Sequence, residues 1–478
     1  PCRQPGRPIA PAPYSVAVLY FDNLSPDTAD AYLADGLTDE IIARLGSLER
    51  LQVKSRTAVA RYRATSLGPP QLGRALGVTY LVNGSVRRGG ARLRMTVELL
   101  RASDGDRVWG QQYDRTDGDL LAIEGDIAGA VAHSIAGRLA PAEQASLTAR
   151  PTRSAAAYDH FVKGNFYLAQ RRSDAAMRAI QEYDAALALD SSFLEPLARI
   201  ALEYALFLDW GWSSPGLTRD SILARGLAAA DLALRRDSTS SDAWMARAFL
   251  LKFRFPQTYA GVRAAFERAI ASDPRNAEAM HQYASSLSEL GDDAAAAAAN
   301  QRALVLEPER AVTLFQFSQF AMIEHRFAEE ERWLDSALAI DPGFFPARTR
   351  RAIARARRGD RAGALVDFET ARQLRGEGLD LAREQALLDG LLGDSVDLRA
   401  ALQRMERELV DPAHPNDLEG VYVARALVVA HEPERAIAFL ERVEPRGIYL
   451  WWLLRWEEFD PIRADPRFQR LVDEARPR

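Results

Sequence analysis

The sequence is poor in the residues on which most enzyme and metal chemistry depends. Its 478 residues include one cysteine, Cys2, and six histidines, none of which stands in a recognisable catalytic motif. A single cysteine excludes an intrachain disulfide and any metal site built on several thiolates. A phosphate-binding glycine-rich loop, a dinucleotide fingerprint and an HExxH motif are also missing. We therefore expect no enzyme activity, no cofactor and no metal.

Long apolar runs and a strong excess of one charge are missing as well. No stretch has the roughly 18 consecutive apolar residues of a membrane span, and no signal peptide is visible. The net charge of −5 gives no reason to expect binding to nucleic acid or to an anionic membrane. The chain begins at Pro1 rather than at a methionine. We expect an upstream segment, and membrane attachment only through that segment.

The sequence does contain a short motif that recurs every 34 residues. An acidic residue followed by proline closes each copy, at Pro274, Pro308 and Pro342. Five residues before each proline, the same slot holds Ala269, Ala303 and Ala337. An apolar slot three residues earlier holds Phe266 and Leu334, although Asn300 stands there in the middle copy. The period and the apolar spacing together predict repeated helical units.

This spacing, with a small-x-x-apolar helix that ends in acid-proline, resembles the tetratricopeptide repeat. A helix pair of this kind cannot bury its apolar face alone, so it stacks on its neighbours and produces a solenoid. The proline cannot continue the helix before it, and it suits the opening of the next helix. We expect an all-α solenoid over residues 158–400, with an inserted loop at 209–217. Degenerate helical repeats and a C-terminal cap are expected at 401–478.

Residues 15–140 have a different pattern. A buried strand is expected at 15–21, turn residues at 22–27, an amphipathic helix at 31–45, a second strand at 51–55 and a short helix at 70–77. Three partly alternating runs follow at 78–88, 92–102 and 107–113, and 119–139 is a closing helix. The order βαβαβββα predicts an α+β domain. A Pro-rich linker at 1–14 precedes it, and a polar connector at 141–157 follows it.

Three blocks in this region resemble the TolB amino-terminal-type domain. They are SVAVLYFDNLSPD, YLADGLTDEIIARLGSLERLQVKSRTAVARY and LGVTYLVNGSVRRGGARLRMTVELLRASDGDRVWGQQYDR. In many bacterial proteins this domain precedes tetratricopeptide repeats. The resemblance implies a non-enzymatic domain that often lies downstream of a Ser/Thr kinase, an adenylate cyclase or a winged-helix DNA-binding domain, often with a membrane span between them. It supplies no catalytic residues.

An arginine-rich helix provides the first candidate partner contacts. Residues 348–361 contain seven arginines, and Arg348, Arg351 and Arg355 fall where the repeat usually packs apolar side chains. One interpretation is an acidic partner bound by these arginines together with Arg358. The alternative is a helix whose arginine stems lie along its neighbours while the charged heads reach water.

Aromatic side chains provide the second set of candidates. Tryptophan is enriched at binding hot spots, so the inserted loop and the C-terminal stretch 451–456 (WWLLRW) are candidate interfaces. Their tryptophans are Trp210, Trp212, Trp451, Trp452 and Trp456. Phe315 and Phe320 lie beside a packing slot held by Phe317 and are added as candidates, although aromatic residues at this spacing are more often part of a core.

Two functional hypotheses follow. The first is a non-enzymatic binding module, in which the solenoid takes a protein or peptide partner as the scaffold or sensor arm of a bacterial signalling or envelope protein. Its expected location is extracytoplasmic, tethered or released, with a cytoplasmic location left open. The second is a structural subunit that self-assembles into a homo-oligomer, ring or filament through contacts between its repeats.

Overall fold

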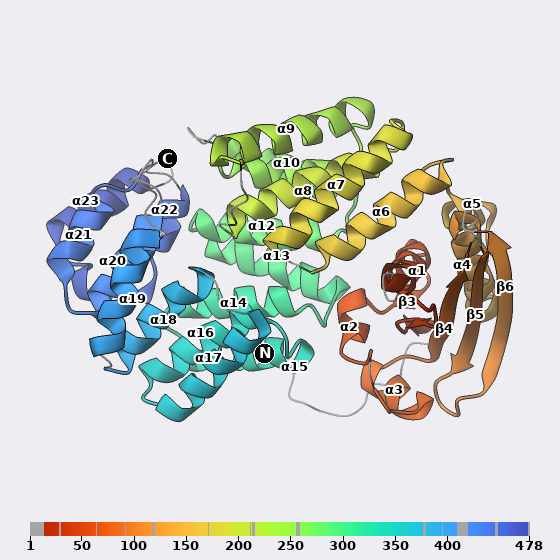
Figure 1. Ribbon diagram of the computed structural model, residues 1–478, viewed down its shortest axis with the longest axis horizontal. Coiled ribbons are helices and arrows are strands. Elements are labelled where there is room, and N and C mark those ends of the chain that lie inside the picture. Colours follow the sequence, from red (N-terminus) through yellow and green to blue (C-terminus); the bar gives the residue numbers. More distant parts are fainter. Residues whose placement is uncertain are drawn as a thin grey trace. The chain divides into compact units, whose positions relative to one another are not determined.

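The computed structural model describes residues 14–476, apart from 28–29, 64, 91, 117–119, 171, 211, 213–215, 255–258, 376–378, 394, 409–418 and 445–447. The chain divides into two compact units, Pro1–Leu250 and Leu251–Arg478, and each is described here by itself (Figure 1). The expected linker at 1–14 lies outside the described residues except for Tyr14. The other domain boundaries expected from the sequence stay predictions.

The first unit begins with a mixed β-sheet that has six strands among the described residues. Its strands are β1 (Ser15–Val18), β2 (Asp22–Asn23), β3 (Gln52–Val53), β4 (Tyr80–Gly89), β5 (Arg92–Arg101) and β6 (Arg107–Thr116). The order is β3-β1-β4-β5-β6, and β2 pairs with β4. Strand β1 runs parallel to β3 and β4, whereas β4, β5 and β6 form antiparallel pairs. Side chains on β5 alternate strictly between exposed and buried from Arg92 to Val97, as a sheet with one covered face requires.

Four helices accompany the sheet: α1 (Ala31–Gly46), α2 (Arg56–Ala60), α3 (Pro69–Leu76) and α4 (Leu120–Ala136). Helices α1 and α4 pack on each other and on the sheet (Figure 1). Their side chains Leu37, Ile41 and Val131 are fully buried. The observed order contains β2 and α2 in addition to the expected elements. The expected turn at 22–27 was wrong at its start, because Asp22 and Asn23 pair with β4 and return the chain to the sheet.

The first unit continues with α5 (Pro141–Thr148), α6 (Ala155–Leu168), α7 (Ser173–Leu189), α8 (Glu195–Asp209), α9 (Arg219–Arg236) and α10 (Ser241–Leu251). The expected connector therefore contains a helix, α5. Leu147 of α5 is fully buried, and its carbonyl oxygen accepts a hydrogen bond of 2.6 Å from Nη1 of Arg44. The expected inserted loop falls between α8 and α9, but four of its residues lie outside the described part.

The second unit repeats a helix pair every 34 residues. Its helices are α11 (Tyr259–Ser272), α12 (Ala277–Glu289), α13 (Asp293–Leu306), α14 (Ala311–Ile323), α15 (Phe327–Ile340), α16 (Phe345–Arg357) and α17 (Arg361–Arg375). The first helices of three successive pairs begin at residues 277, 311 and 345, which confirms the 34-residue phase. Each proline lies in the turn three residues before the next helix, so it ends one helix without opening the next.

The turn inside each pair repeats with the same phase. Gly291, Gly359 and Gly393 have φ values of 78°, 86° and 75°, in the left-handed region that suits glycine. His325 occupies the same position in the repeat between them, with φ of 57°. Because a Cβ atom disfavours this conformation, His325 introduces local strain at a position where the neighbouring repeats use glycine.

The helix pairs continue beyond the regular repeats with α18 (Leu379–Leu391), α19 (Ser395–Glu408), α20 (Glu419–Val429) and α21 (Pro433–Leu440). The chain then forms α22 (Ile448–Leu453), the 3₁₀ helix η3 (Glu457–Ile462) and α23 (Pro466–Ala475). The apolar side chains of α20 to α23 share one buried cluster that includes Phe459 and Phe468. Within the described part of the chain, no helix has the length and hydropathy needed to cross a membrane.

Candidate binding surfaces

The main candidate surface is the inner face of the second unit, defined as the side of α12, α15 and α16 that contacts residues 448–462. We call residues 448–462 the C-terminal segment. It comprises α22, a short turn and η3. Its Tyr449 ring lies 6.4 Å from the ring of Phe253, and Trp451 packs on Gly291 in the turn after α12. The repeat helices thus already hold a stretch of polypeptide from the same chain.

Charged side chains bind the C-terminal segment to α15 and α16. Arg350 donates from Nε to Oε1 of Glu330 at 2.7 Å and from Nη2 to Oε1 of Glu457 at 2.5 Å. Arg357 donates to the same two carboxylates, at 2.5 Å to Glu330 and 2.6 Å to Glu457. Glu330 is fully buried, and Arg350 and Glu457 are less than a tenth exposed. Each carboxylate is therefore shared between two guanidinium groups.

Glu458 extends this network to α20. Its Oε1 lies 2.7 Å from Nη2 of Arg425, and Nη1 of Arg350 lies 3.4 Å away. Burial would raise the pKa of Glu458, but the two arginines outweigh burial and lower that pKa to about 2. Glu458 therefore keeps its negative charge throughout the physiological range of pH.

Aromatic rings line the same region. Trp452 stacks on Tyr449 at 5.9 Å between ring centroids and meets Trp456 edge-on at 5.0 Å. The guanidinium of Arg425 lies 4.2 Å from the centroid of the Trp456 ring, within the range of a cation–π interaction. Trp452 and Trp456 are half-buried, whereas Trp451 is buried. Trp451 and Trp456 thus contact other helices of the same chain, while Trp452 packs within the segment, and the role of all three toward a partner stays a prediction.

The structure brings the expected arginine cluster together around one internal carboxylate. Asp367 of α17 is 2% exposed and receives Arg351 in a bidentate pair, with distances of 2.7 and 2.6 Å. Arg355 lies 2.8 Å and Arg348 3.5 Å from the same carboxylate. Arg358 lies apart, half-exposed, and pairs with Glu331 at 2.8 Å. These arginines therefore connect adjacent helices of the repeat, and binding of an acidic partner by them stays a prediction.

The remaining aromatic candidates lie in or beside the core. Trp212 is 8% exposed, with its ring 5.6 Å from Phe207 and 5.8 Å from Trp210. Phe320 is 5% exposed and belongs to a buried cluster. Phe315 is half-buried, with its ring 5.5 Å from that of Phe344. These contacts favour a packing role, and partner contacts at these residues remain untested predictions.

Sequence reasoning missed four residues of the charged network that joins the inner face to the C-terminal segment, which are Arg350, Arg425, Glu457 and Glu458. Arg350 was passed over because its neighbours occupy the apolar slots, and Arg425 lies in a degenerate repeat. A signal was present at Glu457 and Glu458, which are adjacent acids inside the mostly apolar stretch WWLLRWEEF. Two neighbouring acids between buried aromatic residues predict cationic partners elsewhere in the fold.

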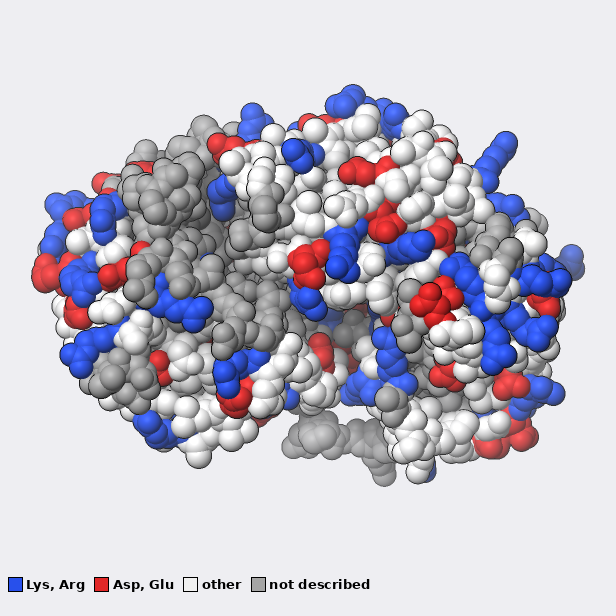
Figure 2. Space-filling model, viewed as in Figure 1, with Lys and Arg blue, Asp and Glu red and all other residues white. Residues whose placement is uncertain are grey.

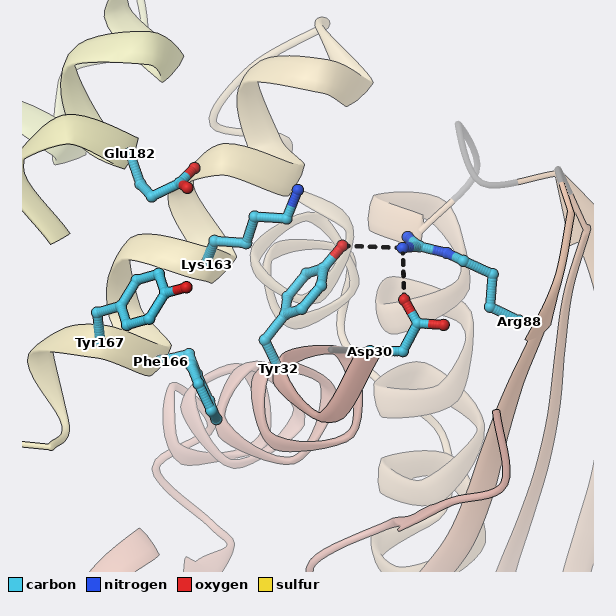
Figure 3. Close-up of a pocket in the computed structure, with 7 residues that line it drawn as sticks. All are labelled: Asp30, Tyr32, Arg88, Lys163, Phe166, Tyr167 and Glu182. Carbon is cyan, nitrogen blue, oxygen red and sulfur yellow. Dashed lines mark hydrogen bonds and ion pairs between the residues drawn. The ribbon is translucent and has the colours of Figure 1, made fainter. Parts of the chain in front are cut away.

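A second candidate is a cavity of about 320 Å³ in the first unit, where α1 and β4 meet the first repeat helices (Figure 3). Its lining residues are Asp30, Tyr32, Arg88, Lys163, Phe166, Tyr167 and Glu182. Nη1 of Arg88 donates to Asp30 at 2.9 Å and to the hydroxyl of Tyr32 at 3.1 Å (Figure 3). The charged groups around this cavity therefore largely compensate one another.

The Tyr32 hydroxyl also connects the cavity to α6, since it donates to Asp159 at 2.6 Å. Lys163 lies 2.7 Å from the same carboxylate. Burial, and then the hydrogen bond to Asp159, raise the pKa of Tyr32 far above its usual value, so its hydroxyl stays protonated. These bonds make the cavity a joint between the α+β region and the first repeat. Among the described residues, no cluster of His, Cys, Asp and Glu has the arrangement of a metal site.

Surface charge does not single out another site. In Figure 2, basic and acidic side chains are interspersed over the described surface. Exposed arginines gather on β5 and β6, but Arg92 and Arg94 both pair with Asp114 at 2.7 and 3.0 Å. Such exposed pairs contribute little to binding energy, because water and salt screen them.

Comparisons with known proteins give one sequence relative and several structures with similar helical repeats. No protein-family model matches the chain. A protein of Rhizobium meliloti (strain 1021) named "Putative adenylate cyclase 3" is 29% identical over 195 residues, which cover 41% of this chain and 33% of the relative. The match therefore spans about a third of the relative's length.

Three solved structures illustrate the structural likeness. Pseudomonas aeruginosa pilF has 17% identity, a TM-score of 0.35, and coverage of 47% of this chain and 96% of its own. A tetratricopeptide repeat protein from Parabacteroides merdae ATCC 43184 has 15% identity, a TM-score of 0.37, and coverage of 58% and 98%. Yeast Tom70 has 14% identity, a TM-score of 0.40, and coverage of 75% and 82%. The tetratricopeptide-like architecture of this chain rests on its own 34-residue helix pairs.

Proposed function

We propose that this chain is the scaffold or sensor part of a bacterial signalling protein and that it binds a polypeptide partner on the inner face of its second unit. The observation that carries the proposal is that this face already holds a polypeptide, the C-terminal segment. It does so with ion pairs, a cation–π contact of Arg350 with Trp456 and a bond to a backbone carbonyl, from Arg455 to Ser288 at 3.0 Å. A surface that holds one segment in one register has the chemistry to hold another.

The signalling context is supported by two observations. The relative from Rhizobium meliloti carries an adenylate cyclase name, and the N-terminal sequence blocks resemble the TolB amino-terminal-type domain. In this proposal the sheet with α1 to α4 is such a domain, with βαβαβββα as its main order. Any catalytic activity of the signalling protein belongs to a region outside this chain, and the chain works outside the cytoplasm.

The proposal is tested by photo-crosslinking in the bacterium that makes the protein. A benzophenone amino acid replaces Phe327, which is half-buried at the start of α15 with its ring centroid 3.8 Å from the guanidinium carbon of Arg357, and in a matched control it replaces Val366, which is 65% exposed on α17. We expect one dominant polypeptide adduct from position 327 and none of that size from position 366. The same adducts from both positions, or none from either, would contradict the proposal.

Self-assembly is the second candidate function, and exposed apolar side chains on α13 and α17 favour it. Val305 is 71% exposed and Val366 is 65% exposed. Light scattering over a range of concentrations tests this candidate, with Val305→Ser and Val366→Ser as variants. We expect any oligomer to dissociate in the variants if these residues carry the contact. A monomer at all concentrations in the unmodified chain rules the candidate out.

A further inference from the structure

The C-terminal segment has an apolar side that belongs to the end of the solenoid. Its buried apolar residues share one cluster with α20, α21 and α23, and they are Leu450, Trp451, Leu453, Leu454, Phe459 and Ile462. This cluster also contains Phe468 and Leu471 of α23. The segment and helices α20 to α23 therefore form one packed body, which we call the terminal body. The same cluster joins it to α18 and α19 through Ala386, Leu398, Leu402 and Met405.

The opposite side of the segment is polar and faces the earlier repeats. Arg455 donates from Nη2 to Asp293 at 2.5 Å and from Nη1 to the carbonyl of Ser288 at 3.0 Å. Asp460 lies 3.5 Å from Nδ1 of His325 at the end of α14. Together with the bonds of Glu457 to α16, these contacts make the closure of the terminal body onto α12 to α16 largely polar, with aromatic contacts added where Trp451 meets Gly291 and Tyr449 meets Phe253.

An ionic closure has a different energetic character from an apolar one. Two charges that leave water lose hydration, and their attraction offsets that loss only when the geometry is good, so apolar residues of similar volume often hold such an interface more tightly. Polar interfaces within a chain resemble transient protein–protein interfaces. The ionic contacts therefore specify one register, and they can open while the apolar residues that join the terminal body to α18 and α19 stay packed.

The inner face also has a fitted position for an indole ring. A Cβ atom on Gly291 would lie 2.6 Å from Cη2 of Trp451, and the φ of Gly291 is 78°. Only glycine suits both the backbone conformation and the close approach of the ring. The surface thus combines an aromatic contact with guanidinium groups placed for carboxylates.

The C-terminal segment leaves some of its own polar atoms unsatisfied where it is seated. Among the described residues, Oε2 of Glu457, Oε2 of Glu458 and Nε1 of Trp456 are buried without a hydrogen-bond partner. A buried polar atom without a partner costs free energy. This cost weakens the hold of the segment, so a polypeptide that binds the same arginines without leaving polar atoms unsatisfied would compete with it.

We propose that the inner face is a binding site for a partner segment in which an aromatic residue is followed by carboxylates, and that Trp456-Glu457-Glu458 is its built-in competitor. This inference rests on the function proposed above. The partner would bind Arg350 and Arg357 after the terminal body moves away. Because the competitor is tethered, its effective concentration is high, about millimolar for short connections, and it reduces the apparent affinity for the partner.

The test uses a fluorescent synthetic peptide with the sequence of residues 449–462, titrated into the full chain and followed by anisotropy. Arg455→Ala weakens the closure at a position whose side chain is 19% exposed, and Arg372→Ala on α17 is the exposed control. We expect Arg455→Ala to bind the peptide about 3- to 10-fold more tightly than the unmodified chain, in line with the modest strength of such an ion pair. The control should bind like the unmodified chain.

A second peptide with Glu457→Gln identifies the contact. It should bind the Arg455→Ala chain at least about 10-fold more weakly than the natural peptide, because it leaves buried guanidinium charge uncompensated. A second chain variant, Glu457→Gln, weakens the competitor itself and should also bind the natural peptide more tightly. Equal binding by all chains, or equal binding of both peptides, overturns the inference.

Two further outcomes separate the possible occupants. One alternative is that the Arg455→Ala chain forms dimers as its concentration rises and that the natural peptide dissociates them. That result would assign the site to a second copy of this chain and overturn the proposal of a separate partner. A specific adduct at position 327 in cells, without peptide binding in vitro, would leave the proposed function standing and overturn this inference. Peptide binding in vitro without any adduct in cells would leave this inference standing and overturn the proposed function.

Discussion

Arg425 on α20 places its Nη2 2.7 Å from Oε1 of Glu458 on η3, and the two side chains are 1% and 4% exposed. They lie 33 positions apart in the sequence and meet inside the second unit. A charge at this depth is tolerated only because an opposite charge compensates it. The pair therefore fixes how the C-terminal segment is seated against α20.

Removal of one partner should be more damaging than removal of both. We expect Arg425→Met to lower the free energy of unfolding by about 3–5 kcal/mol, because Glu458 then loses its main compensating charge. The double variant Arg425→Met with Glu458→Gln should recover most of that loss. Urea unfolding followed by tryptophan fluorescence measures both. Equal destabilisation of the single and double variants would contradict the ion-pair interpretation.

The bidentate pair between Arg351 and Asp367 predicts that lysine is a poor replacement for arginine. Lysine keeps the charge but cannot form the two parallel bonds of 2.7 and 2.6 Å. We expect Arg351→Lys to cost about 1 kcal/mol of stability and Asp367→Asn about 2–3 kcal/mol, because the aspartate serves three arginines. Arg358→Lys, at a half-exposed ion pair, is the control and should have little effect. Thermal melts of the four proteins decide the point.

Asn300 offers a stabilising substitution. It is fully buried in the repeat slot where Phe266 and Leu334 stand, and neither atom of its amide group has a hydrogen-bond partner among the described residues. We expect Asn300→Leu to raise the free energy of unfolding by about 1–3 kcal/mol. The neighbouring exposed residue gives the control, since Gln301→Leu should add nothing. A lower melting temperature for Asn300→Leu would indicate a polar role for Asn300 that outweighs its burial.

Two helical glycines should respond in opposite directions to alanine. A Cβ on Gly164 would lie 2.4 Å from the ring of Tyr183, so Gly164→Ala must displace that ring and should cost about 1–3 kcal/mol. A Cβ on Gly129 of α4 would meet only Gln144, at an ordinary 3.6 Å. Gly129→Ala should therefore stabilise the protein by about 0.5–1 kcal/mol through helix propensity. Chemical denaturation of both variants gives the two signs directly.

The first unit should lose stability as the pH rises from 5 to 7.5. Burial, and then the nearby Glu40, raise the pKa of Glu124 well above its usual value, and burial raises that of Asp39 to about 6. The folded state therefore binds protons that the unfolded state releases, and this contribution is lost as the pH rises through the folded pKa values. Thermal melts at both pH values should show the loss.

Glu124→Gln is the control for this pH dependence. Glutamine keeps an oxygen for the Tyr158 hydroxyl, which donates to Glu124 at 2.6 Å, but it cannot titrate. We expect the variant to lose less stability than the unmodified chain between pH 5 and 7.5. Identical pH profiles for the two proteins would show that Glu124 does not contribute to the effect.

The regular repeats could be predicted because their signal is local. Ala269, Ala303 and Ala337 are all fully buried, as their shared slot before each proline implies, since a small residue there lets two helices approach closely. The expected helix at 379–392 is α18, and that at 433–443 begins where α21 does. The left-handed turn position went unnoticed because His325 interrupts the glycine pattern.

The candidate site was less predictable, because its charges pair over long sequence separations. Arg350 and Glu457 are 107 positions apart, and their contact depends on how the solenoid curves. The aromatic candidates show the same limit. Trp210 and Trp212 were expected at an interface in an inserted loop, and only the packing against Phe207 determines that Trp212 is buried.

The sequence by itself determined the 34-residue helix pairs and most elements of the α+β region, because helix periodicity, strand alternation and turn residues act over short stretches of chain. Only the tertiary structure decided that the arginines around Asp367 serve the fold and that the C-terminal segment occupies the inner face. The physical reason is that the partner of a buried charge is set by the path of the whole chain, which no local pattern specifies.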